Sequence, residues 1–307
     1  MELHSRFMND ISKWLETHYP KTEKGLAAIK HIDALWKIFE PFADTNFQAE
    51  FQSNEPGKFQ QRYWEMHLGC WLLNKGFKLL AHKSEGPDIA IQLPDRKLFI
   101  EAIAPGPGSG PDKVPDITPQ PWKPGEKLEV REVPSKQIIL RWTAAFHVKA
   151  QCIQKYHEAG IITPKDSCII AINSCQLGAF GFDGISTFPA AVEAVYPIGP
   201  QQVHFTIGQP EKTTSDLQYR PEVEKLNKST VTTTPFMGKN FSYVSAILAA
   251  HRNELFMYCQ PEQSLVLVHN QHAAAPIIRK ELPVDIEYWV EPIDSGIRIR
   301  QDPERSI

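Results

Sequence analysis

The sequence lacks the cysteine spacing of a disulfide framework or a structural zinc site. Its five cysteines are scattered over 307 residues, their number is odd, and no two of them form a CxxC pair. Structural zinc sites and disulfide-rich scaffolds both depend on closely spaced, paired cysteines. We therefore expect free thiols and a reducing compartment.

Long hydrophobic runs are also missing. No segment approaches the roughly 18 consecutive apolar residues of a membrane helix, and the first residues, MELHSRFMNDISKW, contain no apolar core of the signal-peptide type. We expect a soluble, intracellular protein, located in the cytoplasm and without membrane contact.

Positive charge is not in excess. The net charge is −3 and the isoelectric point is about 6.4, so no global positive field attracts the protein to nucleic acid. Any contact with nucleic acid therefore has to be local. With 42% hydrophobic residues, the chain is nevertheless long enough to bury a sizeable core.

Apolar spacing divides the chain into two parts. Residues 1–58 read as an N-terminal helical segment, in which Ile32, Leu35, Trp36 and Phe39 share one helical face. Residues 59–307 read as an α/β (α+β) domain with a central mixed β-sheet flanked by helices and a C-terminal β-rich extension. Within it, residues 105–134 contain eight prolines and four glycines, which predicts a long loop.

In the second part, the spacing of apolar residues distinguishes the helices from the strands. We expect helices at residues 59–74 and 135–159, strands on both sides of a turn at 93–96, and strands at 168–173, 202–207 and 264–269. Polar loops are expected at residues 46–58 and 209–234.

Two acids lie in the strands around the 93–96 turn. Alternate residues of a strand share a face, so Glu101 and Ile103 point the same way, and pairing in a hairpin brings Asp88 close to Glu101. Neighbouring carboxylates repel unless a cation lies between them. Mg²⁺, with Mn²⁺ as the alternative, suits such oxygen ligands, and Glu65 offers a third acid from the preceding helix.

This order of elements resembles the PD-(D/E)xK nuclease superfamily, the restriction-endonuclease-like fold. The resemblance is carried by Glu65 in a helix, Gly86-Pro87-Asp88, Phe99-Ile100-Glu101, a long helix and a buried strand. It implies a metal site at Asp88, Glu101 and Glu65. The chain also resembles a group of bacterial proteins through its Ile-Glu-Ala stretch and Val268-His269-Asn270, which implies no substrate.

Ile103 departs from the superfamily pattern, which has a catalytic lysine two residues after the second acid. Lys97 lies roughly 13 Å back along the strand, too far to replace it. Arg141 and Lys149 share one face of the long helix, and the resemblance implies that this helix packs beside the hairpin. Lys149 is therefore the candidate catalytic lysine, which requires its amine to lie within about 6 Å of both carboxylates.

Three further cations are candidates for substrate binding. Arg141 is a candidate phosphate or structural partner, while Lys113 and Lys123 lie in the Pro/Gly-rich loop, where binding residues often occur beside a rigid site.

Two kinds of function remain open. The first is a Mg²⁺-dependent nuclease that hydrolyses DNA or RNA with Asp88, Glu101, Lys149 and Glu65. The second is an inactive nuclease-like module that binds nucleic acid or a protein, including a homodimer partner. Simpler roles are also open: Asp88 as a turn residue, Glu65 as an exposed helix residue paired to Arg62 or Gln61, and Lys149 as a solvated lysine.

Overall fold

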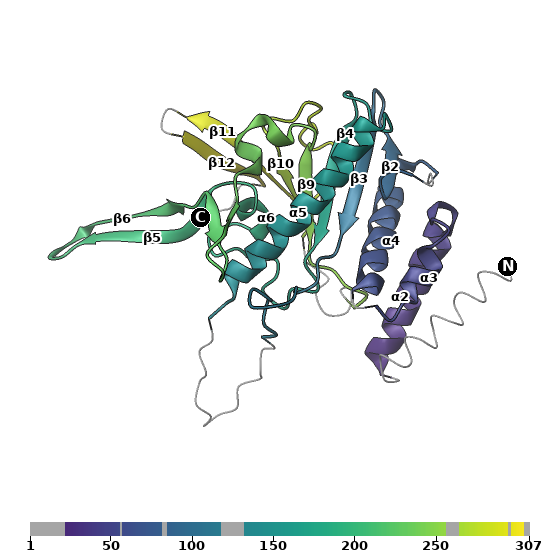
Figure 1. Ribbon diagram of the computed structural model, residues 1–307, viewed down its shortest axis with the longest axis horizontal. Coiled ribbons are helices and arrows are strands. Elements are labelled where there is room, and N and C mark those ends of the chain that lie inside the picture. Colours follow the sequence, from purple (N-terminus) through teal and green to yellow (C-terminus); the bar gives the residue numbers. More distant parts are fainter. Residues whose placement is uncertain are drawn as a thin grey trace.

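A computed structural model describes residues 22–55, 57–81, 85–117, 132–255, 264–293 and 296–303, without the side chains of 209–212. Its centre is an eight-stranded mixed sheet in the order β1-β2-β3-β4-β9-β10-β11-β12 (Figure 1). The strands of this sheet are β1 Lys78–Leu79, β2 Ile89–Gln92, β3 Lys97–Ile103, β4 Ser167–Asn173, β9 Ala246–Ala250, β10 Val266–His269, β11 Ile286–Ile293 and β12 Gly296–Asp302.

The sheet contains both parallel and antiparallel pairs. Strands β1, β2 and β3 are antiparallel neighbours, and β3, β4 and β9 run parallel. Strand β10 is antiparallel to β9 and parallel to β11, and β12 closes the sheet as an antiparallel edge. The centre is apolar on both faces, since every residue of β4 is buried, as expected for an inner parallel strand.

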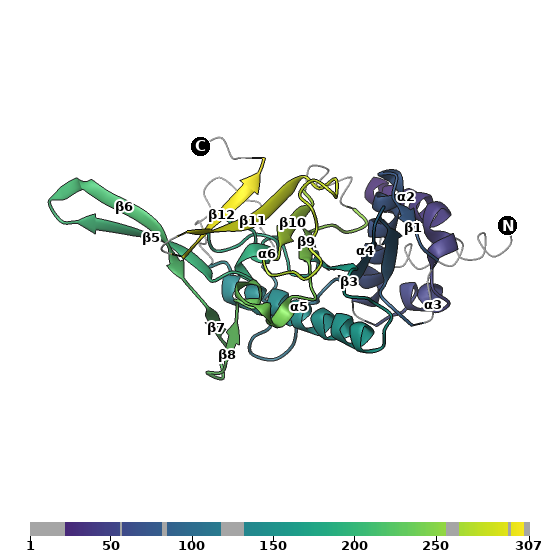
Figure 2. The same ribbon diagram turned by 90° about the horizontal axis from the view of Figure 1, so that it is seen from above.

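Helices cover both faces of the sheet (Figures 1 and 2). The helices are α2 Glu23–Phe39, α3 Phe47–Phe51, α4 Lys58–Asn74, α5 Ser135–Glu158 and α6 Ala190–Glu193, with short 3₁₀ turns η1 Glu40–Phe42, η2 Pro235–Met237 and η3 Lys239–Phe241. Helices α2 and α4 share one apolar core with Ile100. Helix α5 shares the other with Phe99. A mixed α/β fold with a helix-flanked central sheet is thus confirmed.

The helices beside the hairpin follow the expected apolar spacing. The face of Ile32, Leu35, Trp36 and Phe39 is buried in α2. Helices α4 and α5 begin and end within one residue of the expected positions, and Gly76 and Gly160 end them with positive φ angles. The boundary expected at residue 58 stays a prediction, and the helix expected at the start of the chain lies outside the described residues.

Two segments expected as loops contain regular structure. Residues 46–58 include α3, where Phe47 and Phe51 are buried against the α2–α4 core. Residues 209–234 form β6 Gln209–Tyr219, β7 Glu222–Glu224 and β8 Thr230–Thr232. These strands are polar because little of their surface enters the core, and period-2 polar residues carry no hydrophobic signal.

Strand β6 pairs with β5 Ile198–Thr206 in a two-stranded hairpin that projects away from the body of the protein (Figures 1 and 2). Its apolar residues Val203, Phe205, Ile207 and Tyr219 are exposed. We call residues 201–217 the arm. Among the described residues, no helix is long and apolar enough to cross a membrane.

Candidate functional site

The β2–β3 hairpin brings Asp88 and Glu101 together. Ile89 pairs with Ile100 in the antiparallel register, so Asp88, one residue before β2, lies beside Glu101. The backbone N–H of Ala102 donates to Asp88 Oδ2 at 2.8 Å, which fixes the orientation of this carboxylate. The turn forms where it was expected, with Leu93 N donating to Arg96 O at 2.9 Å.

Lys149 reaches both acids from α5. Its Nζ lies 2.9 Å from Asp88 Oδ2 and 2.5 Å from Glu101 Oε2, well inside the 6 Å required of a lysine that replaces the one missing at position 103. Ile103 itself packs against the α5 core. An ammonium group from α5 thus lies between the two carboxylates of the hairpin.

Burial differs sharply among these three side chains. Glu101 is 2% exposed, Lys149 15% and Asp88 24%, so solvent reaches the site past Asp88. The second oxygen of Glu101, Oε1, is buried, and within the described part of the chain it has no hydrogen-bond partner. Buried carboxylate oxygens are costly to leave unpaired, which makes this oxygen a candidate ligand atom.

The protonation behaviour of the site follows from its burial and charge. The pKa of Glu101 is raised to about 7, first by burial and then by the negative charge of Asp88, while Lys149 opposes the rise. Burial also disfavours the charged form of Lys149, but Asp88 and Glu101 outweigh it and raise the pKa of the amine. Lys149 therefore stays an ammonium at neutral pH and cannot act as a base there.

The Glu65 carboxylate pairs with Arg62 rather than with the Lys149 that joins Asp88 and Glu101. Its Oε2 accepts a hydrogen bond at 2.8 Å from Arg62, which also pairs with Asp44 at 2.8 Å and Glu50 at 2.6 Å. The pKa of Glu65 is raised to about 8, first by burial and then by the charge of Asp88, and Arg62 opposes the rise. Among the described residues, no three His, Cys, Asp or Glu side chains group as metal ligands, so the expected three-acid cluster is not assembled.

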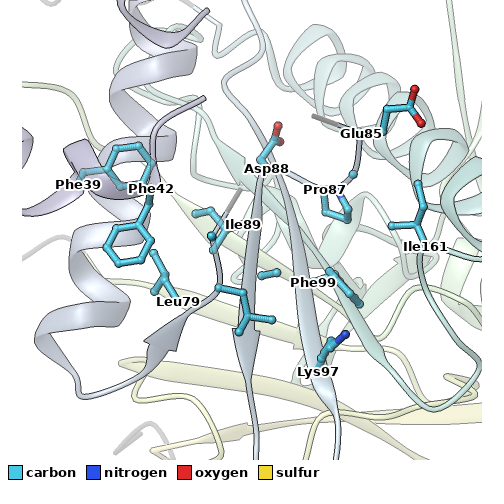
Figure 3. A pocket seen from close by; sticks show the side chains of 14 residues that line it. Phe39, Phe42, Leu79, Glu85, Pro87, Asp88, Ile89, Lys97, Phe99 and Ile161 are labelled. Carbon is cyan, nitrogen blue, oxygen red and sulfur yellow. The ribbon is translucent and has the colours of Figure 1, made fainter. Parts of the chain in front are cut away.

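A small cavity lies along β2 on the outer side of the site. Figure 3 shows Phe39, Phe42 and Leu79 on one side and Phe99 and Ile161 on the other, with Asp88 at the end of the strand. Its volume of about 70 Å³ has room for a few water molecules. Asp88 lines this cavity together with Glu85 and Lys97, and most of the other lining residues are apolar.

Two of the three cations expected to bind substrate lie in the described part of the chain. Arg141 Nε donates to the Gly106 carbonyl oxygen at 2.8 Å, two helical turns before Lys149 on α5. Lys113 is exposed in the loop that follows Gly110, and Lys123 lies outside the described residues. Only Arg141 is thus placed on the helix that carries Lys149.

Sequence reasoning missed one group that supports the site and gave another only as an alternative. The Gln61 side chain holds the end of β3, because its Nε2 donates to Ala102 O at 2.9 Å and its Oε1 accepts from Ala104 N at 2.8 Å. The Arg62 cluster was foreseen only as an option for Glu65. The three-residue spacing of Arg62 and Glu65 on a helix was the available signal, whereas nothing in the sequence indicates the Gln61 contacts.

Comparison of the chain with family models, curated proteins and solved structures gives no match.

Proposed function

We propose that this chain is a divalent-cation-dependent nuclease of the PD-(D/E)xK type, with Lys149 replacing the lysine that the motif has at position 103. One observation carries the proposal: Lys149 Nζ lies 2.9 Å from Asp88 and 2.5 Å from Glu101. The element order α4, β1, β2, β3, α5, β4 supports it, because it is the order on which the resemblance rests.

A cation such as Mg²⁺ fits the donor set. Asp88 Oδ2 accepts hydrogen bonds from Lys149 and from Ala102 N, and Glu101 Oε2 accepts one from Lys149. The other oxygen of each carboxylate therefore remains for a cation. Glu101 Oε1 is buried and unpartnered in the described structure. Mg²⁺ accepts one or two carboxylates and keeps its other positions for water and phosphate. When bound, such a cation would lower the pKa of a water molecule and neutralise negative charge on the phosphate oxygens.

The chain's own residues then have separate roles. Asp88 and Glu101 hold the cation, and the Ala102 N–H keeps Asp88 aimed. The Lys149 ammonium donates to the phosphate or to the incoming water and stabilises the negative charge that develops, a contribution of about 10²–10³ in rate for one positioned donor. Glu65 pairs with Arg62 and makes no direct contact with the cation.

The test is cleavage of plasmid DNA, single-stranded DNA and RNA with Mg²⁺ or with chelator. Asp88→Asn, Glu101→Gln and Lys149→Met should each lower cleavage at least about 100-fold, with circular dichroism unchanged. Lys155→Met, an exposed lysine on the same helix, and Asp95→Asn, an exposed acid at the hairpin turn, are matched controls. Cleavage that survives both acid substitutions contradicts the proposal.

An inactive binding module is the second candidate. Two observations favour it. Lys149 already neutralises both acids by ion pairing, and the described residues assemble no three-ligand metal group. In that case calorimetry detects no Mg²⁺ binding and no nucleic acid is cut. Mg²⁺ binding to wild type that is lost in Glu101→Gln decides for the nuclease site.

A further inference from the structure

A groove opens beside the candidate site at the carboxyl end of β3. It is bounded by Lys58 and Gln61 at the start of α4 and by Arg141 and Val148 on α5, and its floor includes Ile103. The groove measures about 420 Å³, within the range of pockets that hold one small ligand. Crevices outside the carboxyl ends of strands are where open α/β sheets bind ligands.

The groove contains a cation that lacks a counter-charge. Arg141 Nε donates to Gly106 O, and among the described residues no carboxylate forms an ion pair with its guanidinium. Gly108 packs over this group, since a Cβ there would lie 3.3 Å from Arg141 Nη1. Lys58, across the groove, is already paired with Glu55 at 3.2 Å. Arg141 is thus the group that an incoming anion meets unpaired.

Distance relates this cation to the proposed site. Arg141 and Lys149 are eight residues apart on α5, so they are roughly 12 Å apart along the helix axis. Between them Ala144 and Ala145 leave room on the groove wall. An anion on Arg141 therefore lies beyond the phosphate at Lys149 rather than on it.

We infer that the groove holds one nucleotide of a single nucleic-acid strand, with a phosphate neighbouring the cleaved one on Arg141. This inference rests on the proposed nuclease function. The groove is nucleotide-sized and far smaller than a double helix. No aromatic side chain lines it among the described residues, so bases find no stacking surface, and contacts to phosphate and sugar carry no sequence preference.

Anisotropy of fluorescein-labelled oligo(dT) and oligo(rU), measured in chelator so that cleavage does not run, tests the groove. Arg141→Ala should weaken binding about tenfold and reduce the slope of log affinity against log salt by about 0.7. Arg141→Lys should restore the slope. Lys155→Ala, exposed on the same helix, is the matched control and should bind as wild type does.

Val148 gives a second test that does not depend on Arg141. It is 53% exposed at the groove rim, so both charged substitutions should fold. Val148→Glu should weaken strand binding and Val148→Lys should strengthen it, each about threefold. The inference is overturned if both Val148 variants and Arg141→Ala bind the single strand with the affinity of wild type. It is also overturned if a duplex binds as tightly as the single strand.

The outcomes separate this inference from the nuclease proposal. The groove inference alone is contradicted if wild type cleaves with Mg²⁺ but strand binding is unaffected by the substitutions at Arg141 and Val148. Strand binding that depends on both residues without any cleavage supports the groove and overturns the nuclease in favour of a binding module.

Discussion

Glu101 lies in the middle of β3 with 2% of its side chain exposed, and only Oε2 has a partner in the described structure. Its charge is tolerated because Lys149 lies 2.5 Å away, while Asp88 on the neighbouring strand opposes it. The three side chains are therefore coupled: removal of one changes the energy of the other two. Stability and catalysis can be separated by choosing which charges are removed together.

Lys149→Met should destabilise the protein by about 3 kcal/mol, because it leaves two close carboxylates without a counter-charge. Asp88→Asn and Glu101→Gln added to it should recover most of this loss, since a neutral triad is cheap to bury. Urea unfolding followed by circular dichroism measures both. A triple variant as unstable as Lys149→Met contradicts the electrostatic explanation, and Lys155→Met should leave the midpoint unchanged.

Glu254 is a second buried acid, outside the candidate site, and it makes stability depend on pH. Its Oε2 accepts from Gln60 at 2.8 Å, and burial raises its pKa from 4.5 to about 7. The folded protein therefore keeps a proton that the unfolded chain releases above pH 4.5, so this acid lowers stability as pH rises from about 4.5 to 7.

Glu254→Gln keeps the shape and an acceptor for Gln60 but cannot ionise. We expect it to match wild type near pH 4.5 and to exceed it by about 3 kcal/mol at pH 8. Chemical unfolding at four pH values gives the comparison, with Glu158→Gln, exposed at the end of α5, as control. A constant difference at every pH contradicts the assigned cause.

At the scale of elements, α2 and α4 approach each other closely at one glycine. A Cβ at Gly69 would lie 2.5 Å from Phe39 Cε2, and Phe39 is buried in the core that α2 shares with α4. The glycine therefore sets the separation of the two helices. Helix α4 carries Gln61, which ties the end of β3, so this spacing also supports the site.

Gly69→Ala should destabilise the protein by about 1–3 kcal/mol through overpacking, although alanine favours a helix by about 1 kcal/mol over glycine. Thermal unfolding shows whether the substitution lowers or raises the melting temperature. Gly238→Ala is the control, because nothing lies within 4 Å of a Cβ there and its φ is negative. A stabilised Gly69→Ala variant means that Phe39 can move aside.

Local patterns explain which elements the sequence could predict. Helices α4 and α5 and the β2–β3 hairpin have apolar spacing and turn residues that act over a few positions, and Lys149 could be nominated from helical spacing. The order of β9, β10 and β11 in the sheet depends on pairing between distant segments, which no local pattern encodes. The unpaired Glu101 oxygen and the Arg141 groove likewise arise only when β3, α4 and α5 pack together.

At the scale of the whole molecule, the arm stands apart from the two cores. None of its described side chains, which leave out those of 209–212, belongs to either hydrophobic cluster, and Phe205 is 71% and Ile207 92% exposed. The hairpin joins the body at Ile198, which is buried, and through Arg220, whose guanidinium donates to Ile198 O at 2.8 Å. An isolated two-stranded hairpin is marginally stable in water, so the body gains little from the arm.

Replacing residues 202–216 by Asn-Gly tests this division. Gln201 pairs with Leu217, and a two-residue type I′ turn suits such a pair. We expect a melting temperature within about 2 °C of wild type, because a loss of a few tenths of a kcal/mol shifts it by no more than that in a protein of this size. Differential scanning calorimetry measures the melting temperature.

Arg220→Ala is the contrasting variant, because it breaks the ion pair between the base of the hairpin and Glu193. Glu193 is completely buried and would lose its counter-charge, so this variant should melt at a lower temperature than wild type. A shortened arm that melts as low as Arg220→Ala would show that the arm belongs to the folded core.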